Sequence, residues 1–210
     1  MENRLELVTY STGTAAEALG MTRRTVLNYR DRHGIWPTHD DRKLFRADVF
    51  DLAEMLAMKK LFGQIGGEEA AWIAKLCTKP VAFFALLHFS VWENGGRALE
   101  ATGIGQFEAI SALIEKKFPG SKAGGLGIWP AGMPGEPKMP RRWLVFWESN
   151  FDDVLQMDDL DRVHAYMDSN PARKREVGKF LNLEEIGAEL AERFPSLVRV
   201  LAPEGSTLGA

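Results

Sequence analysis

The stretch that decides the fold of the first part of the chain is residues 11–37, which read STGTAAEALGMTRRTVLNYRDRHGIWP. Its spacing of apolar and capping residues predicts two short helices, over residues 12–19 and 23–33. Gly20 and Gly34 each follow one of these helices, at the place where glycine commonly ends a helix. Two short helices joined by a tight, glycine-containing junction are typical of a helix-turn-helix.

The second of these helices is expected to have a packing face and a free face. Val26 and Tyr29 lie close together on a helical wheel, whereas Arg24, Asn28 and Arg32 project from the opposite side. An arginine can form two hydrogen bonds with a guanine edge, and an asparagine can do the same with adenine. The free face therefore predicts a helix that reads DNA bases.

Further residues around this helix are predicted to contact DNA phosphates. Thr22 is placed to cap the helix, whose first turn carries free backbone N–H groups that favour anions. Residues 36–46 fit a short hairpin, named here the wing, whose basic residues suit the DNA backbone or the minor groove. The complete predicted DNA-binding set is Thr22, Arg23, Arg24, Thr25, Asn28, Arg32, Arg42, Lys43 and Arg46.

Several short motifs occur together in the first third of the chain. Within residues 8–77 they are Tyr10-Ser11, Ala15-Ala16, Gly20-Met21-Thr22, Arg24-Thr25-Val26, Tyr29, Gly34-Ile35-Trp36-Pro37 and the segment 42–49. Together they resemble the winged-helix N-terminal domain of MerR-family regulators and the related excisionase-type domains. This resemblance implies that Thr22, Arg24 and Tyr29 cap the recognition helix, contact DNA or brace it. It also implies that Arg42 and Lys43 lie in the wing.

Two features depart from that family's pattern, the first in the recognition helix and the second in the cysteines that its metal sensors use. Residues 27–30 read Leu-Asn-Tyr-Arg where the family usually has Arg-Tyr-Tyr-Glu, so we expect a different base preference. Cys77 is the single cysteine, which excludes a disulfide and a multi-thiolate metal site within one chain. We therefore expect no metal and no cofactor, and we interpret Cys77 as a buried structural thiol.

The composition is that of an ordinary globular protein, with 45% hydrophobic residues and a net charge of −3 over 210 residues. Positive charge is local: residues 22–46 carry seven Lys or Arg against three acids. The first residues lack the basic start and apolar run of a secretory signal, and the apolar residues 81–92 are too few to span a bilayer. We therefore expect a cytoplasmic, nucleoid-associated protein of bacterial or phage type, without membrane contact.

The expected fold class is α+β, with a winged helix-turn-helix domain over residues 1–78 and an α+β domain of unassigned fold over residues 79–210. The second domain is expected to bind an effector or a partner, or to dimerise. Asp48 is placed to cap a third helix, and a fourth helix is expected at 68–76, with its stop at Pro80. The further expected elements are strands at 81–91, 143–147 and 197–201, helices at 105–117, 160–167 and 183–194, and a Gly- and Pro-rich loop at 119–140.

The favoured hypothesis is a dimeric, sequence-specific transcriptional regulator that is not an enzyme. Its expected partners are double-stranded DNA, a second copy of the chain, and RNA polymerase or a small-molecule effector. A dimer is expected because one short helix makes too few base contacts for operator-level specificity. The alternative is an excisionase-type architectural accessory factor. The least favoured is a metal-dependent nucleic-acid enzyme built on Asp152, Asp153, Asp158, Asp159 and Asp161, which lack the spacing of an EF-hand loop.

Overall fold

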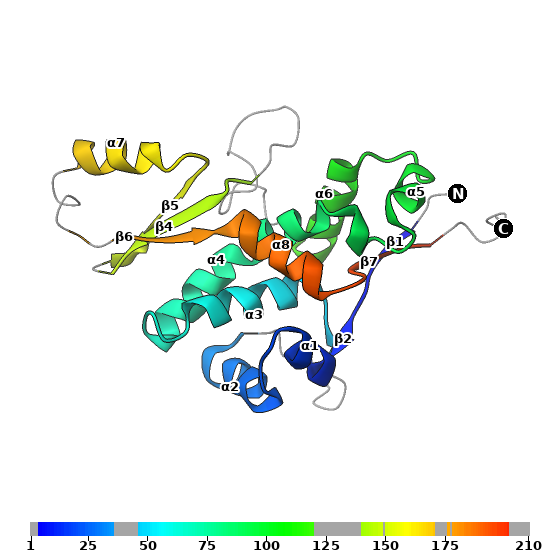
Figure 1. Ribbon diagram of the computed structural model, residues 1–210, viewed down its shortest axis with the longest axis horizontal. Helices are drawn as coiled ribbons and strands as arrows, with labels where there is room; N and C mark the ends of the chain where they lie inside the picture. Colours follow the sequence, from blue (N-terminus) through cyan, green and yellow to red (C-terminus); the bar gives the residue numbers. More distant parts are fainter. Residues whose placement is uncertain are drawn as a thin grey trace.

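The computed structural model describes residues 4–35, 46–119, 140–148, 150–170, 176 and 178–201. These residues form mixed α and β structure, as the sequence predicted in this coarse form, with helices at the centre and small sheets around them (Figure 1). In chain order the elements are β1 (Arg4–Leu7), β2 (Tyr10–Ser11), α1 (Thr12–Ala18), α2 (Arg23–His33), β3 (Arg46–Ala47), α3 (Val49–Leu61), α4 (Gly67–Leu86), the 3₁₀ turn η1 (Phe89–Val91), α5 (Gly95–Glu100), α6 (Gln106–Lys117), β4 (Trp143–Trp147), β5 (Asn150–Met157), α7 (Asp161–Ser169), β6 (Gly178–Asn182), α8 (Leu183–Arg193) and β7 (Val198–Leu201). Within those ranges, no helix is long and apolar enough to cross a membrane.

The first two predicted helices are confirmed together with their end signals. The Ser11 hydroxyl accepts a hydrogen bond from the Thr14 backbone N–H at 3.2 Å, which caps α1. Gly34 ends α2 with a left-handed backbone (φ 59°), a conformation that costs glycine little. Residues 36–45 of the predicted wing lie outside the described residues. The adjoining β3 pairs antiparallel with β2.

Helix α4 corrects two predictions. The sequence predicted a helix that stops at Pro80 and then a strand over residues 81–91. In the structure α4 instead continues to Leu86 with Pro80 inside it, and η1 follows. Most side chains from Ala70 to Leu86 are buried. A helix buried on all sides gives an apolar run that periodicity cannot distinguish from a buried strand. Burial of the residues after Pro80 offsets the backbone hydrogen bond that proline removes.

Helices α3, α4 and α8 pack against one another and form the centre of the molecule, with α1 and α2 along one side of it (Figure 1). The contact between α4 and α8 is unusually close at Gly187. A Cβ atom built there would lie 2.5 Å from Phe84 Cβ and 2.9 Å from the Ala85 backbone nitrogen. Glycine is therefore required on α8 at this crossing.

A three-stranded antiparallel sheet in the order β5–β4–β6 lies at one end of the molecule. The sequence predicted β4, and this strand is confirmed. Its alternate side chains lie on opposite faces of the sheet. Leu144 and Phe146 join the main core, whereas Val145 and Trp147 pack with Val163 of α7. Strands β5 and β6 were not predicted. Strand β6 leads directly into α8.

The two ends of the described chain meet, because β1 pairs antiparallel with β7. Leu5 lies opposite Val200 and Leu7 lies opposite Val198. The predicted domain boundary between residues 78 and 79 falls inside α4, and one hydrophobic core contains residues from both sides of it. An independently folding unit over residues 1–78 stays a prediction from the sequence alone, and the shared core leads us to expect a single folding unit instead.

Candidate nucleic-acid interface

Helix α2 is docked on the rest of the protein by one face. Val26 is 1% exposed and Tyr29 is 4% exposed, as expected for the predicted packing face. The Tyr29 ring packs against Phe62, which follows α3, with ring centroids 5.3 Å apart, and against His33 at 6.4 Å. Burial raises the pKa of the Tyr29 hydroxyl. These contacts fix which side of α2 faces outward.

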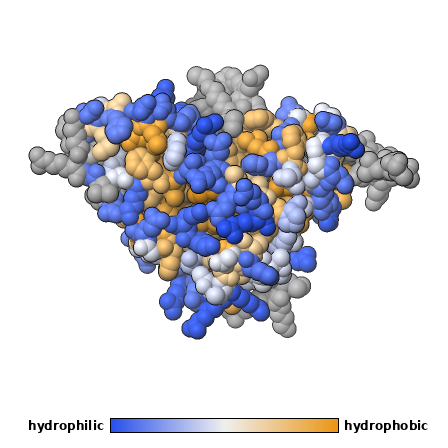
Figure 2. Space-filling view, viewed as in Figure 1, coloured by the Kyte–Doolittle hydropathy of each residue, from blue (hydrophilic) through white to orange (hydrophobic). Residues whose placement is uncertain are grey.

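The opposite face of α2 carries the predicted base-reading side chains. Arg24, Asn28 and Arg32 are exposed, and so is Arg23 at the start of the helix. None of these four side chains makes a hydrogen bond or ion pair with another described residue. Hydrophilic residues cover much of the margin where α1 and α2 lie (Figure 2). This face therefore offers donors that are available to a ligand.

The threonines of the first turn act within the helix itself. Thr22 Oγ1 accepts a hydrogen bond from the Thr25 backbone N–H at 3.0 Å, and the two hydroxyl oxygens are 2.8 Å apart. Thr22 is thus the helix cap that the sequence predicted, and Thr25 is its partner. Arg46 is exposed in β3 and donates to Thr9 Oγ1 at 3.5 Å. Arg42 and Lys43 lie outside the described residues.

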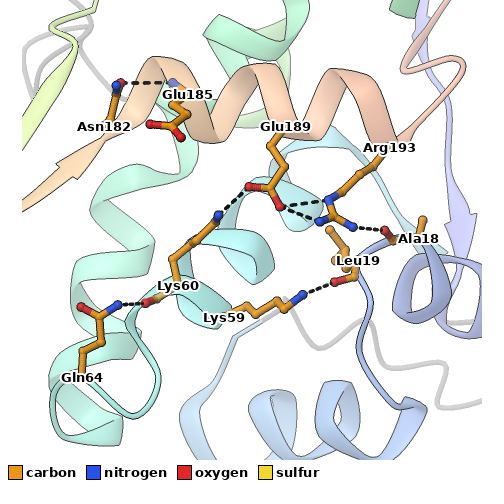
Figure 3. Close-up of polar contacts among 9 residues, drawn as sticks. All are labelled: Ala18, Leu19, Lys59, Lys60, Gln64, Asn182, Glu185, Glu189 and Arg193. Atoms are coloured by element: carbon orange, nitrogen blue, oxygen red, sulfur yellow. Dashed lines mark hydrogen bonds and ion pairs between the residues drawn. The ribbon is translucent and has the colours of Figure 1, made fainter.

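The turn between α1 and α2 is held from two directions (Figure 3). Lys59 of α3 donates to the Leu19 carbonyl oxygen at 2.6 Å, and Arg193 of α8 donates to the Ala18 carbonyl oxygen at 2.8 Å. Both carbonyls belong to the end of α1, where a helix leaves acceptors without partners. Two cations at this negative end fix the position of the turn and hence of α2.

Glu189 holds Arg193 in place and also pairs with Lys60, the neighbour of Lys59 (Figure 3). One of its oxygens accepts hydrogen bonds from Arg193 at 2.7 and 3.0 Å, and the other lies 2.6 Å from Lys60 Nζ. Burial acts to raise the pKa of Glu189, but the hydrogen bonds and charges of Lys60 and Arg193 outweigh burial and lower it. Sequence reasoning missed this network because its members lie in α1, α3 and α8.

A group of buried charges lies at the start of α3 and was also not predicted. Asp48 caps α3 as expected, and its carboxylate is 2.6 Å from Lys117 Nζ of α6. Asp51 is 3.5 Å from the same nitrogen. Burial and the Asp48 charge raise the pKa of Asp51 to about 6. The available signal was two acids, Asp51 and Glu54, within an otherwise apolar stretch of helix.

Cys77, Asp158 and Asp159 are further chemical candidates, and each has an ordinary structural role. Cys77 is fully buried, and burial raises the pKa of its thiol, so it is the structural thiol that the sequence predicted. In the acidic cluster, Asp158 is paired with Arg141 at 2.9 Å, and Asp159 accepts the backbone N–H of Asp161 at 2.9 Å. These contacts account for Asp158 and Asp159 by local structure.

Comparison with protein-family models, with curated proteins and with solved structures finds no match for this chain.

Proposed function

We propose that this protein is a sequence-specific, DNA-binding transcriptional regulator. In this proposal α1, the turn and α2 form a helix-turn-helix of the MerR or excisionase type, and α2 enters the major groove. The observation that carries the proposal is the free face of α2. Arg24, Asn28 and Arg32 are spaced four residues apart, which distributes them over about 12 Å of the helix. That length matches three to four base pairs, at roughly 3.4 Å each.

The way α2 is held supports this role. Its packing face is buried, and the turn before it is bonded to Lys59 and Arg193. A recognition helix fixed in advance loses little conformational freedom when it binds. The wing would add Arg42, Lys43 and Arg46 on the DNA backbone beside the site of α2.

We further propose that two copies of the chain bind one operator. Three side chains on a single helix discriminate too few base pairs, and two half-sites about 34 Å apart would double that number. RNA polymerase is the proposed downstream partner.

Alanine substitution on the free face tests the proposal. Arg24→Ala and Asn28→Ala should each weaken binding to a selected duplex by about 5- to 150-fold, because one bidentate base contact contributes about 1–3 kcal/mol of discrimination. Binding to unrelated duplexes should change much less. Arg42→Ala should weaken binding to all duplexes alike, because a phosphate contact carries no sequence information. Fluorescence anisotropy with labelled duplexes at several salt concentrations measures both effects.

The matched control is Arg162→Ala. Arg162 is an exposed arginine on α7, which lies far from α2 (Figure 1). Arg162→Ala removes the same charge from a helix surface, and it should leave the affinities for the selected duplex and for unrelated duplexes unchanged. Equal binding by the wild type and by the variants at positions 24, 28 and 42 would rule out the proposed interface. Binding confined to sites where DNA is bent for recombination, with no effect on nearby promoters, would instead support the architectural accessory factor.

A further inference from the structure

A cavity of about 380 Å³ lies where the end of α2 meets α3, α4 and α6. Gly34, which ends α2, forms part of its lining. Acidic, basic and aromatic side chains from the other three helices line the rest. This volume lies within the range of small-molecule sites, about 300–1,000 Å³. Whatever fills the cavity touches the end of the helix proposed to read DNA.

Glu54 of α3 lines this cavity as a buried acid. Its side chain is 9% exposed, and it forms no hydrogen bond or ion pair with any described residue. Its neighbour Asp51 differs, because Asp51 and Asp48 share Lys117. Burial is the main cause that raises the pKa of Glu54, to about 7. A buried carboxylate of this kind is stabilised by a hydrogen-bond donor, above all a cationic one.

Two lysines of α4 supply positive charge at the same cavity. Lys75 and Lys79 are one helical turn apart and therefore project on the same side of α4. Lys75 is exposed and makes no hydrogen bond or ion pair with a described residue. Lys79 Nζ lies 5.0 Å from the centroid of the Phe118 ring, and burial lowers the pKa of Lys79. The cavity thus has an acceptor, Glu54, on α3 and two cations, Lys75 and Lys79, on α4.

The cavity also has an aromatic wall. Phe50 and Phe118 line it, with ring centroids 5.2 Å apart and planes nearly perpendicular. Such a pair accepts an apolar group against its faces and edges.

We propose that this cavity binds a small zwitterion of the α-amino-acid type with an apolar side chain. The ammonium group donates to Glu54, the carboxylate binds Lys75 and Lys79, and the side chain packs on Phe50 and Phe118. A molecule with only one of the two charges forms a charged hydrogen bond either with Glu54 or with the lysines, but not with both. Binding of the zwitterion does not depend on the proposed function.

The consequence for DNA rests on the proposed function. The Lys75 ammonium nitrogen lies 3.8 Å from the position of a Cβ built on Gly34. A ligand carboxylate that draws Lys75 to itself changes the surroundings of Gly34, the residue that caps the end of α2. The amino acid is therefore expected to act as an effector that changes the affinity for DNA.

Isothermal titration calorimetry on the full chain tests the binding, with L-phenylalanine, L-leucine and L-methionine as probes. At least one should bind. If L-phenylalanine binds, 3-phenylpropionate, which lacks the ammonium group, and phenethylamine, which lacks the carboxylate, should bind at least tenfold more weakly. For L-leucine or L-methionine, the analogues lacking one charged group serve the same purpose. A folded wild type that binds none of the three amino acids, or that binds the analogues equally well, overturns the proposal.

Two variants locate the site. Glu54→Gln should weaken binding of the amino acid at least tenfold while the chain stays folded, because the change removes a buried charge without changing the shape of the side chain. Lys75→Met should also weaken this binding. Lys116→Met, at an exposed lysine of α6 outside the cavity lining, should have no effect. Thermal unfolding of each variant checks the fold. Unchanged binding in a folded Glu54→Gln variant contradicts the assignment.

The two proposals fail separately. An amino acid that binds to a chain without DNA affinity leaves this site intact and removes the proposed function. DNA binding by a chain that binds no amino acid removes this site and leaves the proposed function intact.

Discussion

Glu54 shows how strongly one residue can depend on its surroundings. It lies on a helix whose neighbouring positions are apolar, and the fold removes its carboxylate from water. Burial raises its pKa most, and the Asp51 charge adds to this effect. The charges of Lys75 and Lys117 act in the opposite direction but from a distance. A proton is therefore held more tightly on Glu54 in the folded chain than in the unfolded chain.

The free energy of unfolding is expected to fall as the pH rises through this region. Below the unfolded pKa of Glu54, near 4.5, both states are protonated and the full stabilisation is present; it is lost as the pH rises to the folded value of about 7. The loss from Glu54 amounts to about 3 kcal/mol, at 1.36 kcal/mol per pKa unit. Urea unfolding of the wild type and of Glu54→Gln between pH 4.5 and 8 measures it.

In that experiment the Glu54→Gln variant should show a flatter dependence on pH, and it should be more stable than the wild type at pH 8. Glu100→Gln, at an exposed acid of α5, is the matched control and should run parallel to the wild type. Parallel curves for the wild type and Glu54→Gln would mean that Glu54 is not kept from water in solution.

The crossing of α4 and α8 depends on the absence of a side chain at Gly187. Gly187→Ala should lower the free energy of unfolding by about 1–3 kcal/mol, the usual cost of overpacking a core. The added Cβ would meet the α4 backbone, including the Val81 carbonyl oxygen at 2.9 Å, which cannot turn away as a side chain can. Thermal or denaturant unfolding gives the difference.

Gly13→Ala serves as the control for helix propensity. Gly13 is an exposed glycine of α1, and a Cβ there would meet only Ser11 Oγ at an ordinary 3.8 Å. This change should be neutral or stabilising, because alanine favours a helix by up to about 1 kcal/mol over glycine. Similar gains from both substitutions would show that α4 and α8 are farther apart than described.

Elements with local signals could be predicted from the sequence. Helix α2 has its cap at Thr22 and its stop at Gly34, so a few adjacent residues specify both of its ends. The part of α4 after Pro80 could not be predicted, because burial by α8 and its neighbours decides its conformation. The same difference holds for the sites. The free face of α2 follows from one helical wheel, whereas the cavity requires α3, α4 and α6 to meet.

For the whole molecule, the predicted division at residue 78 can be tested by unfolding. Helix α4 crosses that position, and β1 pairs with β7 near the other end of the chain. We therefore expect one cooperative transition in the full chain, with far-UV circular dichroism and tryptophan fluorescence changing together. A fragment of residues 1–78 should unfold without cooperativity, because it lacks the half of α4 that packs on α8. Two separate transitions, or a cooperative fragment, would instead support independent domains.

The proposed function requires that α2 recognise DNA, and selection from a random duplex library tests this recognition most directly. The purified full chain should enrich a defined sequence, with two half-sites about one helical turn apart if the chain binds as a dimer. The Arg24→Ala and Asn28→Ala variants should lose or change that sequence, and Arg162→Ala should select the same one as the wild type. A wild type that enriches no sequence would contradict DNA recognition by α2. The same sequence enriched by the wild type and by the variants at positions 24 and 28 would contradict it as well.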